Sequence, residues 1–147
     1  DAVALRRSLT AGKPADCVQR IVSGFVGAWM RGQFESGAVR WVYAHRWSHL
    51  LLRRSWFASA NARDEANGWS FRFIPGGAGL FYGVDVARCG IVTFLTANGA
   101  AELGPILCRG DYAIARYLPS GVRFERSQVI AEGAPFCDFR YREPSAD

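Results

Sequence analysis

The spacing of apolar residues changes at Asn67, and this change constrains the fold more than any other feature of the sequence. Before it, apolar side chains recur every three or four residues, which is typical of amphipathic helices. Directly after it, over residues 69–74, apolar and polar side chains largely alternate, which is typical of a strand with one buried face. The chain therefore combines helices with strands.

The same patterns predict eight elements in the order α-α-β-β-α-α-β-β. They are a helix after Pro14 ending near Gly37, a helix over 38–61, strands over 69–74 and 80–86, helices over 89–98 and 101–118, and strands over 122–125 and 137–142. The Gly-rich stretch 75–79 predicts a turn between the first two strands. This order favours an α+β fold, with an antiparallel sheet of about four strands and helices packed on one face.

Length and composition limit the domain organisation. We expect residues 1–147 to form a single domain in which 1–15 are a flexible N-terminal segment. Hydrophobic residues at 50% and charged residues at 21% exclude an intrinsically disordered chain. There is no apolar run of about 18 residues, which excludes a transmembrane helix. The start has no apolar signal-peptide region, so we expect a cytoplasmic protein.

The net charge of +5 could indicate a nucleic-acid partner, but its distribution does not. Lys13 is the only lysine, and the arginines are scattered without a dense cluster. We therefore expect no nucleic-acid and no membrane partner, and favour a small-molecule carboxylate as the ligand. The apolar, glycine-bearing first helix could serve as the contact of a homo-oligomer.

The four cysteines form no CxxC pair, and without secretory signals we expect reduced thiols rather than two disulfides. Each could simply be a small buried apolar residue. Cys89, however, follows Arg88 at a predicted helix N-terminus, where the dipole and the cation lower a thiol pKa. Cys17 belongs to the first helix, and we expect it to have a packing role only.

The other two cysteines each have an aspartate nearby in the sequence. A helix would place Cys108 and Asp111 on one face, because they are three residues apart. Cys137 directly precedes Asp138, and a strand would direct the two side chains to opposite faces.

Two histidines are the available neutral bases near pH 7. His45 and His49 are four residues apart within the predicted helix 38–61, which would place both imidazoles on one face, as in a zinc pair. The alternative is that they are surface residues or hydrogen-bonded core residues. We treat them as auxiliary base candidates.

An ordered set of motifs in residues 69–142 resembles the L-2-amino-thiazoline-4-carboxylic acid hydrolase family. The matching positions are Gly83-Val84-Asp85, Cys89, Gly99-Ala100, Glu102-Leu103, Pro105, Cys108, Asp111, Glu132-Gly133 and Cys137-Asp138-Phe139-Arg140. The chain departs from the family pattern at Val86 and Arg88, where many members have a tyrosine and an acidic residue. The departure puts the substrate assignment in question more than the fold.

The resemblance implies a hydrolase that opens a thiazoline ring to a carbamoyl-cysteine. The catalytic candidates are Cys89, Cys108, Asp111, Cys137 and Asp138. We favour a thiolate, from Cys89 or Cys108, that adds to the ring carbon while Asp111 or Asp138 moves protons. A divalent metal on the three cysteines with bound water as nucleophile is the alternative, although their spacing is far from a compact zinc signature. We therefore expect no cofactor.

The substrate-binding candidates are Arg88, Arg126, Arg140, Tyr82 and Glu132. Arg126 and Arg140 could grip a carboxylate with paired hydrogen bonds, or could instead lie on solvated strand faces. Trp69 and Tyr82 could line a pocket. Two other functions stay open: a divergent family member that catalyses a different biosynthetic step, and a non-enzymatic domain that binds a ligand or a metal.

Overall fold

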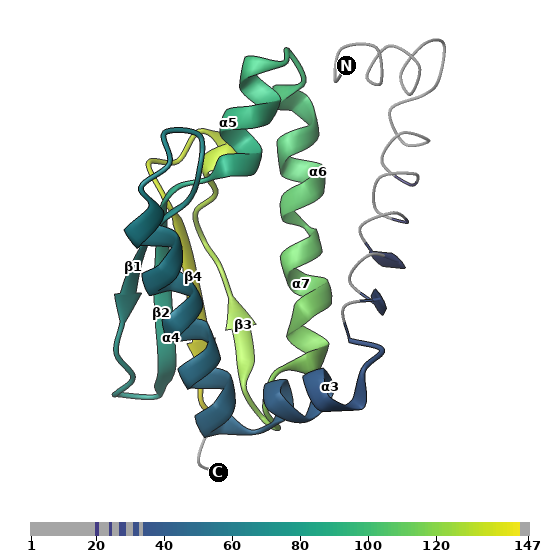
Figure 1. Cartoon of the computed structure of the whole chain (residues 1–147), viewed down its shortest axis with the longest axis vertical. Coiled ribbons are helices and arrows are strands. Elements are labelled where there is room, and N and C mark those ends of the chain that lie inside the picture. Colours follow the sequence, from purple (N-terminus) through teal and green to yellow (C-terminus); the bar gives the residue numbers. More distant parts are fainter. Residues whose placement is uncertain (1–19, 21–23, 25–26, 29–30, 33, 145–147) are drawn as a thin grey trace.

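The computed structural model describes residues 20, 24, 27, 28, 31, 32 and 34–144 (Figure 1). Residues 1–15 and Cys17 lie outside them, so the predictions for that segment and that thiol are not tested here. Among the described residues of the first predicted helix, those from Arg20 to Gly32 are helical, but residues 34–36 are not, so the prediction that this helix continues to near Gly37 is wrong. No described helix is long and apolar enough to cross a membrane.

The prediction of one helix over 38–61 is wrong, because the helix is interrupted at His45. Helix α3 covers Gly37–Ala44 and helix α4 covers Arg46–Arg63, while His45 between them has an extended backbone (φ −95°, ψ 125°). The Ser48 hydroxyl donates to the carbonyls of Val42 at 2.8 Å and of His45 at 3.1 Å. The bond to Val42 satisfies a carbonyl group that an uninterrupted helix would have paired internally, whereas the His45 carbonyl also accepts a hydrogen bond from His49 N at 2.9 Å.

The predicted hairpin is confirmed. Strand β1 (Ser70–Ile74) pairs antiparallel with β2 (Leu80–Arg88), with Phe73 opposite Val84. The connection requires left-handed backbone at Ala78 (φ 50°) and Gly79 (φ 77°), and glycine adopts that region without steric cost.

The sheet is completed by two strands near the C-terminus. Strands β3 (Arg123–Glu125) and β4 (Cys137–Arg142) also pair antiparallel, and the sheet order is β1-β2-β4-β3. The connection from β2 to β3 contains α5 (Gly90–Ala97), η1 (Ala101–Leu103), α6 (Gly104–Cys108), α7 (Gly110–Ile114) and η2 (Ala115–Tyr117), so the helix predicted over 101–118 is divided into four short segments. A further short turn, η3 (Ile130–Glu132), lies between β3 and β4.

The core lies between the helices and one face of the sheet. Figure 1 shows α4 in front of the sheet and α6 and α7 beside β3. Phe57 of α4 packs in one cluster with Phe71, Val84 and Tyr141 from three strands. The fold is thus α+β with a four-stranded antiparallel sheet, as the sequence predicts.

Candidate functional site

The two faces of the sheet separate the charged residues of the motifs. Asp85 is buried on the face away from the helices, where Arg72 Nε donates to it at 3.0 Å and Arg140 Nη2 lies 2.8 Å from it. Burial would raise the pKa of Asp85, but these two arginines hold it below its usual value. Arg140 is therefore paired with Asp85 on the face of the sheet away from the helices, which we call the outer face.

Three cysteines from distant parts of the chain converge on the face of the sheet that packs against the helices, which we call the inner face. Cys89 precedes α5, Cys108 ends α6 and Cys137 begins β4, and all three thiols are free and contribute to the core. Cys137 Sγ accepts a hydrogen bond from the backbone of Ile130 at 3.3 Å. The prediction that Cys137 and Asp138 point to opposite faces is confirmed, since Asp138 binds a loop instead.

Asp111 and Arg126 form an ion pair beside these thiols. Arg126 Nη1 donates to Asp111 Oδ2 at 2.6 Å and to the Cys108 carbonyl at 3.1 Å, and its side chain is only 6% exposed. The pKa of Asp111 is raised to about 6, because burial outweighs the nearby positive charges of Arg126 and Arg53. A carboxyl group that titrates near neutral pH is suited to general acid–base work.

The sequence-based prediction of a lowered pKa at Cys89 is wrong. Burial raises the pKa of Cys89, and the backbone N–H groups of Val92 and Ile91 only partly offset it. Arg88 does not assist, because its guanidinium turns outward and bonds Asp64 at 3.1 Å. Burial, followed by the charge of Asp111, raises the pKa of Cys108 to about 12. Burial also raises that of Cys137.

A second polar cluster lies next to the first, on the buried side of α4. His49 Nε2 is 2.8 Å from Tyr82 Oη, and both side chains are almost fully buried. The Tyr82 ring stacks on Tyr141 at 4.3 Å between centroids. Arg53, one helical turn after His49, donates to Tyr141 Oη at 3.4 Å. Burial and the charge of Arg53 lower the pKa of His49 to about 4, so this imidazole is neutral at pH 7.

Sequence reasoning did not single out Arg53 or Tyr141. The available signal was the four-residue spacing from His49 through Arg53 to Phe57, which places an arginine on the buried stripe of α4. His45 does not join this cluster. It is exposed, its ring lies against Trp41 at 4.2 Å, and the break before α4 turns it away from His49.

Two further candidates lie apart from the thiols. Glu132 is exposed in η3. The Asp138 carboxylate accepts hydrogen bonds from Ser127 N at 2.8 Å, Ser127 Oγ at 2.6 Å and Gln128 N at 2.5 Å. These bonds anchor the loop after β3 and, although burial opposes them, hold the pKa of Asp138 low.

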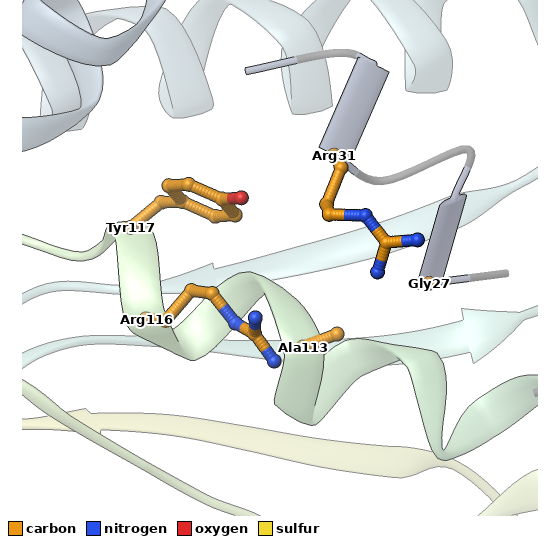
Figure 2. A pocket seen from close by; sticks show the side chains of 5 residues that line it. All are labelled: Gly27, Arg31, Ala113, Arg116 and Tyr117. Atoms are coloured by element: carbon orange, nitrogen blue, oxygen red, sulfur yellow. The ribbon is translucent and has the colours of Figure 1, made fainter. Parts of the chain in front are cut away.

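The surface near the thiols has one opening of substrate size among the pockets described. This groove of about 470 Å³ is lined by residues that include Trp69 of the loop before β1, Gly90 and Leu107, the latter two being chain neighbours of Cys89 and Cys108. A second hollow between Arg31, Arg116 and Tyr117 (Figure 2) has about 20 Å³, room for about one water molecule. Within the described ranges, no three His, Cys, Asp or Glu side chains are grouped as metal ligands.

Comparison with known proteins assigns the chain to a family. A family model described as L-2-amino-thiazoline-4-carboxylic acid hydrolase matches residues 15–141. No curated protein and no solved structure is detectably similar to the chain. The match includes the helices before β1, so the resemblance is not restricted to the motifs in 69–142. Because the match spans most of the chain, this protein belongs to the L-2-amino-thiazoline-4-carboxylic acid hydrolase family.

Proposed function

We propose that this protein hydrolyses a small thiazoline-type ring, opening 2-amino-thiazoline-4-carboxylate to a carbamoyl-cysteine. Family membership supports the reaction class. The observation that carries the proposal is the contact of one guanidinium with two groups: Arg126 bonds both the Cys108 carbonyl and the Asp111 carboxylate. A potential nucleophile and a potential base are thereby held on the same side of the sheet.

Cys108 is the thiol best placed to act as nucleophile. It is partly exposed, whereas Cys89 and Cys137 are 7% and 4% exposed. The charge of Asp111 is the second largest cause of the raised pKa of Cys108, whereas it comes last among the causes that raise the pKa of Cys89 and of Cys137.

At rest Cys108 is a thiol, and the reaction has to remove its proton as it attacks. The sulfur of Cys108 would add to the ring carbon between nitrogen and sulfur while Asp111 accepts the thiol proton. Protonation neutralises Asp111 and so removes the negative charge that disfavours a thiolate at Cys108. Asp111 would then return the proton to the ring sulfur as the ring carbon–sulfur bond breaks. Water would displace Cys108 from the carbon, so that one water is consumed and the thiol is restored.

The test is incubation of the purified protein with 2-amino-thiazoline-4-carboxylate. We expect a product heavier by one water, together with a new free thiol that a colorimetric thiol reagent detects. Cys108→Ser should lower turnover at least about a hundredfold, since a serine hydroxyl is a far weaker nucleophile than a thiol. Cys17→Ser should be close to silent and serves as the matched control.

Two results would contradict the proposal. Lack of ring opening by the folded wild-type protein would reject the substrate. Full turnover by Cys108→Ser would reject Cys108 as nucleophile. If Cys89→Ser abolished turnover in that case, the nucleophile would be the thiol at the start of α5.

A further inference from the structure

Arg53 carries a charge inside the protein that no described carboxylate neutralises. Its Nε is buried without a hydrogen-bond partner, and its guanidinium lies over the rings of Phe57 at 4.8 Å and Trp56 at 5.5 Å. Its hydrogen bond to Tyr141 Oη is long, at 3.4 Å. None of the ion pairs formed by the described residues includes Arg53.

The groups around Arg53 do not supply an anion at neutral pH. Burial raises the pKa of Tyr82 and of Tyr141, so both phenols keep their protons. His49 is neutral or, in acid, positive. A buried charge without an opposite charge is costly, and proteins usually pair it or use it to hold a ligand.

One negative charge that acts on this arginine is that of Asp111 in the neighbouring cluster. The charge of Arg53 is among the causes that lower the pKa of Asp111, so the two groups lie close enough to interact although they are not an ion pair. Asp111 is already bonded to Arg126. Arg53 on α4 and Asp111 on α7 thus both lie over the inner face of the sheet. The charges of both residues act on the pKa of Tyr141 on β4.

We propose that Arg53 binds the carboxylate of the substrate and thereby selects carboxylate-bearing rings. This inference rests on the proposed function. A 2-amino-thiazoline-4-carboxylate has an anionic carboxylate at one end and an electrophilic amidine-type carbon at the other. Because the charges of Arg53 and Asp111 act on each other, a ring held by its carboxylate on Arg53 would extend its amidine end toward Asp111 and Cys108. Guanidinium groups are well suited to this task because they donate parallel hydrogen bonds to a carboxylate.

The two arginines suggested by the sequence are less suited to this task. Arg126 already shares its charge with Asp111, and Arg140 pairs with Asp85 on the opposite face of the sheet. Arg53 is the buried arginine of the inner face whose charge stays uncompensated within the described part of the chain.

The test compares two substrates, 2-amino-thiazoline-4-carboxylate and the same ring without its carboxylate, 2-amino-2-thiazoline. Arg53→Met should lower kcat/KM for the carboxylate between about 10-fold and 100-fold, as expected for loss of a hydrogen bond to a charged group. It should leave kcat/KM for 2-amino-2-thiazoline, which lacks the carboxylate, within about threefold, which also demonstrates that the variant folds. Arg53→Lys should recover part of the lost preference because it restores the charge without the planar donors.

Arg54→Met is the matched control, since Arg54 is exposed and lies over Phe73 at 5.2 Å. It should retain the wild-type preference for the carboxylate. If Arg53→Met turns over both rings with the wild-type preference, the assignment of Arg53 is wrong while the proposed function stands. If the wild-type protein opens neither ring, the proposed function fails and the carboxylate role of Arg53 fails with it.

Discussion

Asp111 accepts a hydrogen bond from Arg126 at 2.6 Å, yet its pKa is raised to about 6 rather than lowered. Burial is the largest cause, and the positive charges of Arg126 and Arg53 offset only part of it. The result is a carboxyl group that is mostly ionised at pH 7 and can still take up a proton. Its position beside Cys108 makes it the natural proton acceptor of the site.

The first prediction concerns the pH dependence of activity. A base has to be ionised, so kcat/KM of the wild-type protein should rise with pH through about 6, the pKa of Asp111. Asp111→Asn should lower kcat/KM at least about a hundredfold and remove this rise. Asp64→Asn, at an exposed residue paired with Arg88, is the control and should keep the wild-type profile. An unchanged profile in Asp111→Asn would reject Asp111 as the base.

The second prediction concerns the reactivity of the thiols. Burial and then the charge of Asp111 raise the pKa of Cys108 to about 12. Asp111→Asn removes that charge, so the pKa should fall and iodoacetamide should label Cys108 faster at pH 8. Peptide mass spectrometry would measure the rate at each cysteine. Equal acceleration at Cys89 and Cys137 would contradict the prediction, because it would indicate a loosened fold rather than a local electrostatic effect.

The third prediction concerns stability in acid. The pKa of His49 is about 4 in the folded protein against 6.5 in the unfolded chain, so the unfolded chain binds more protons between these values. The free energy of unfolding should therefore fall as the pH drops from 6.5 to 4. The shift from 6.5 to about 4 corresponds to a loss on the order of 3 kcal/mol.

His49→Gln can keep a hydrogen bond to Tyr82 but cannot take up a proton in this range. Urea unfolding at several pH values should show a smaller acid loss in this variant than in the wild-type protein. His45→Gln, at the exposed imidazole before α4, should keep the wild-type dependence. An equal acid loss in His49→Gln and the wild-type protein would exclude His49 as its source.

The fourth prediction concerns the loop after β3. Asp138 accepts three hydrogen bonds from Ser127 and Gln128, so Asp138→Asn should lower the free energy of unfolding by about 1–3 kcal/mol. Glu125→Gln disrupts an exposed pair with Arg142 and should cost less than about 1 kcal/mol. Urea unfolding of both variants at pH 7 measures the difference. Equal costs would mean that the Asp138 bonds do not anchor the loop.

Features that depend on neighbouring residues in the chain were predictable from the sequence. The alternation that begins at residue 69 identified β1, and the glycines after it identified the turn to β2. The same two-residue period placed Cys137 and Asp138 on opposite faces. The ordered motifs also pointed to the family that the match over residues 15–141 establishes.

The break at His45 required knowledge of the packing. Residues 38–61 have helical spacing throughout, so the sequence pattern alone favours one long helix. In the folded chain α3 and α4 are separate, and the Ser48 hydroxyl bonds to carbonyls near the break. Because His45 is not part of α4, the two imidazoles do not share a helix face, and the predicted pairing of His45 with His49 is wrong.

The chemistry of the site was also decided by the tertiary structure. A helix N-terminus predicts a lowered pKa for Cys89, but burial, the largest effect, depends on segments far away in the sequence. The unpaired charge of Arg53 likewise follows from its placement among aromatic side chains of α4 and the sheet. Periodicity in the sequence therefore determined which residues face inward, whereas the fold determined how far each is removed from water and which charges act on it.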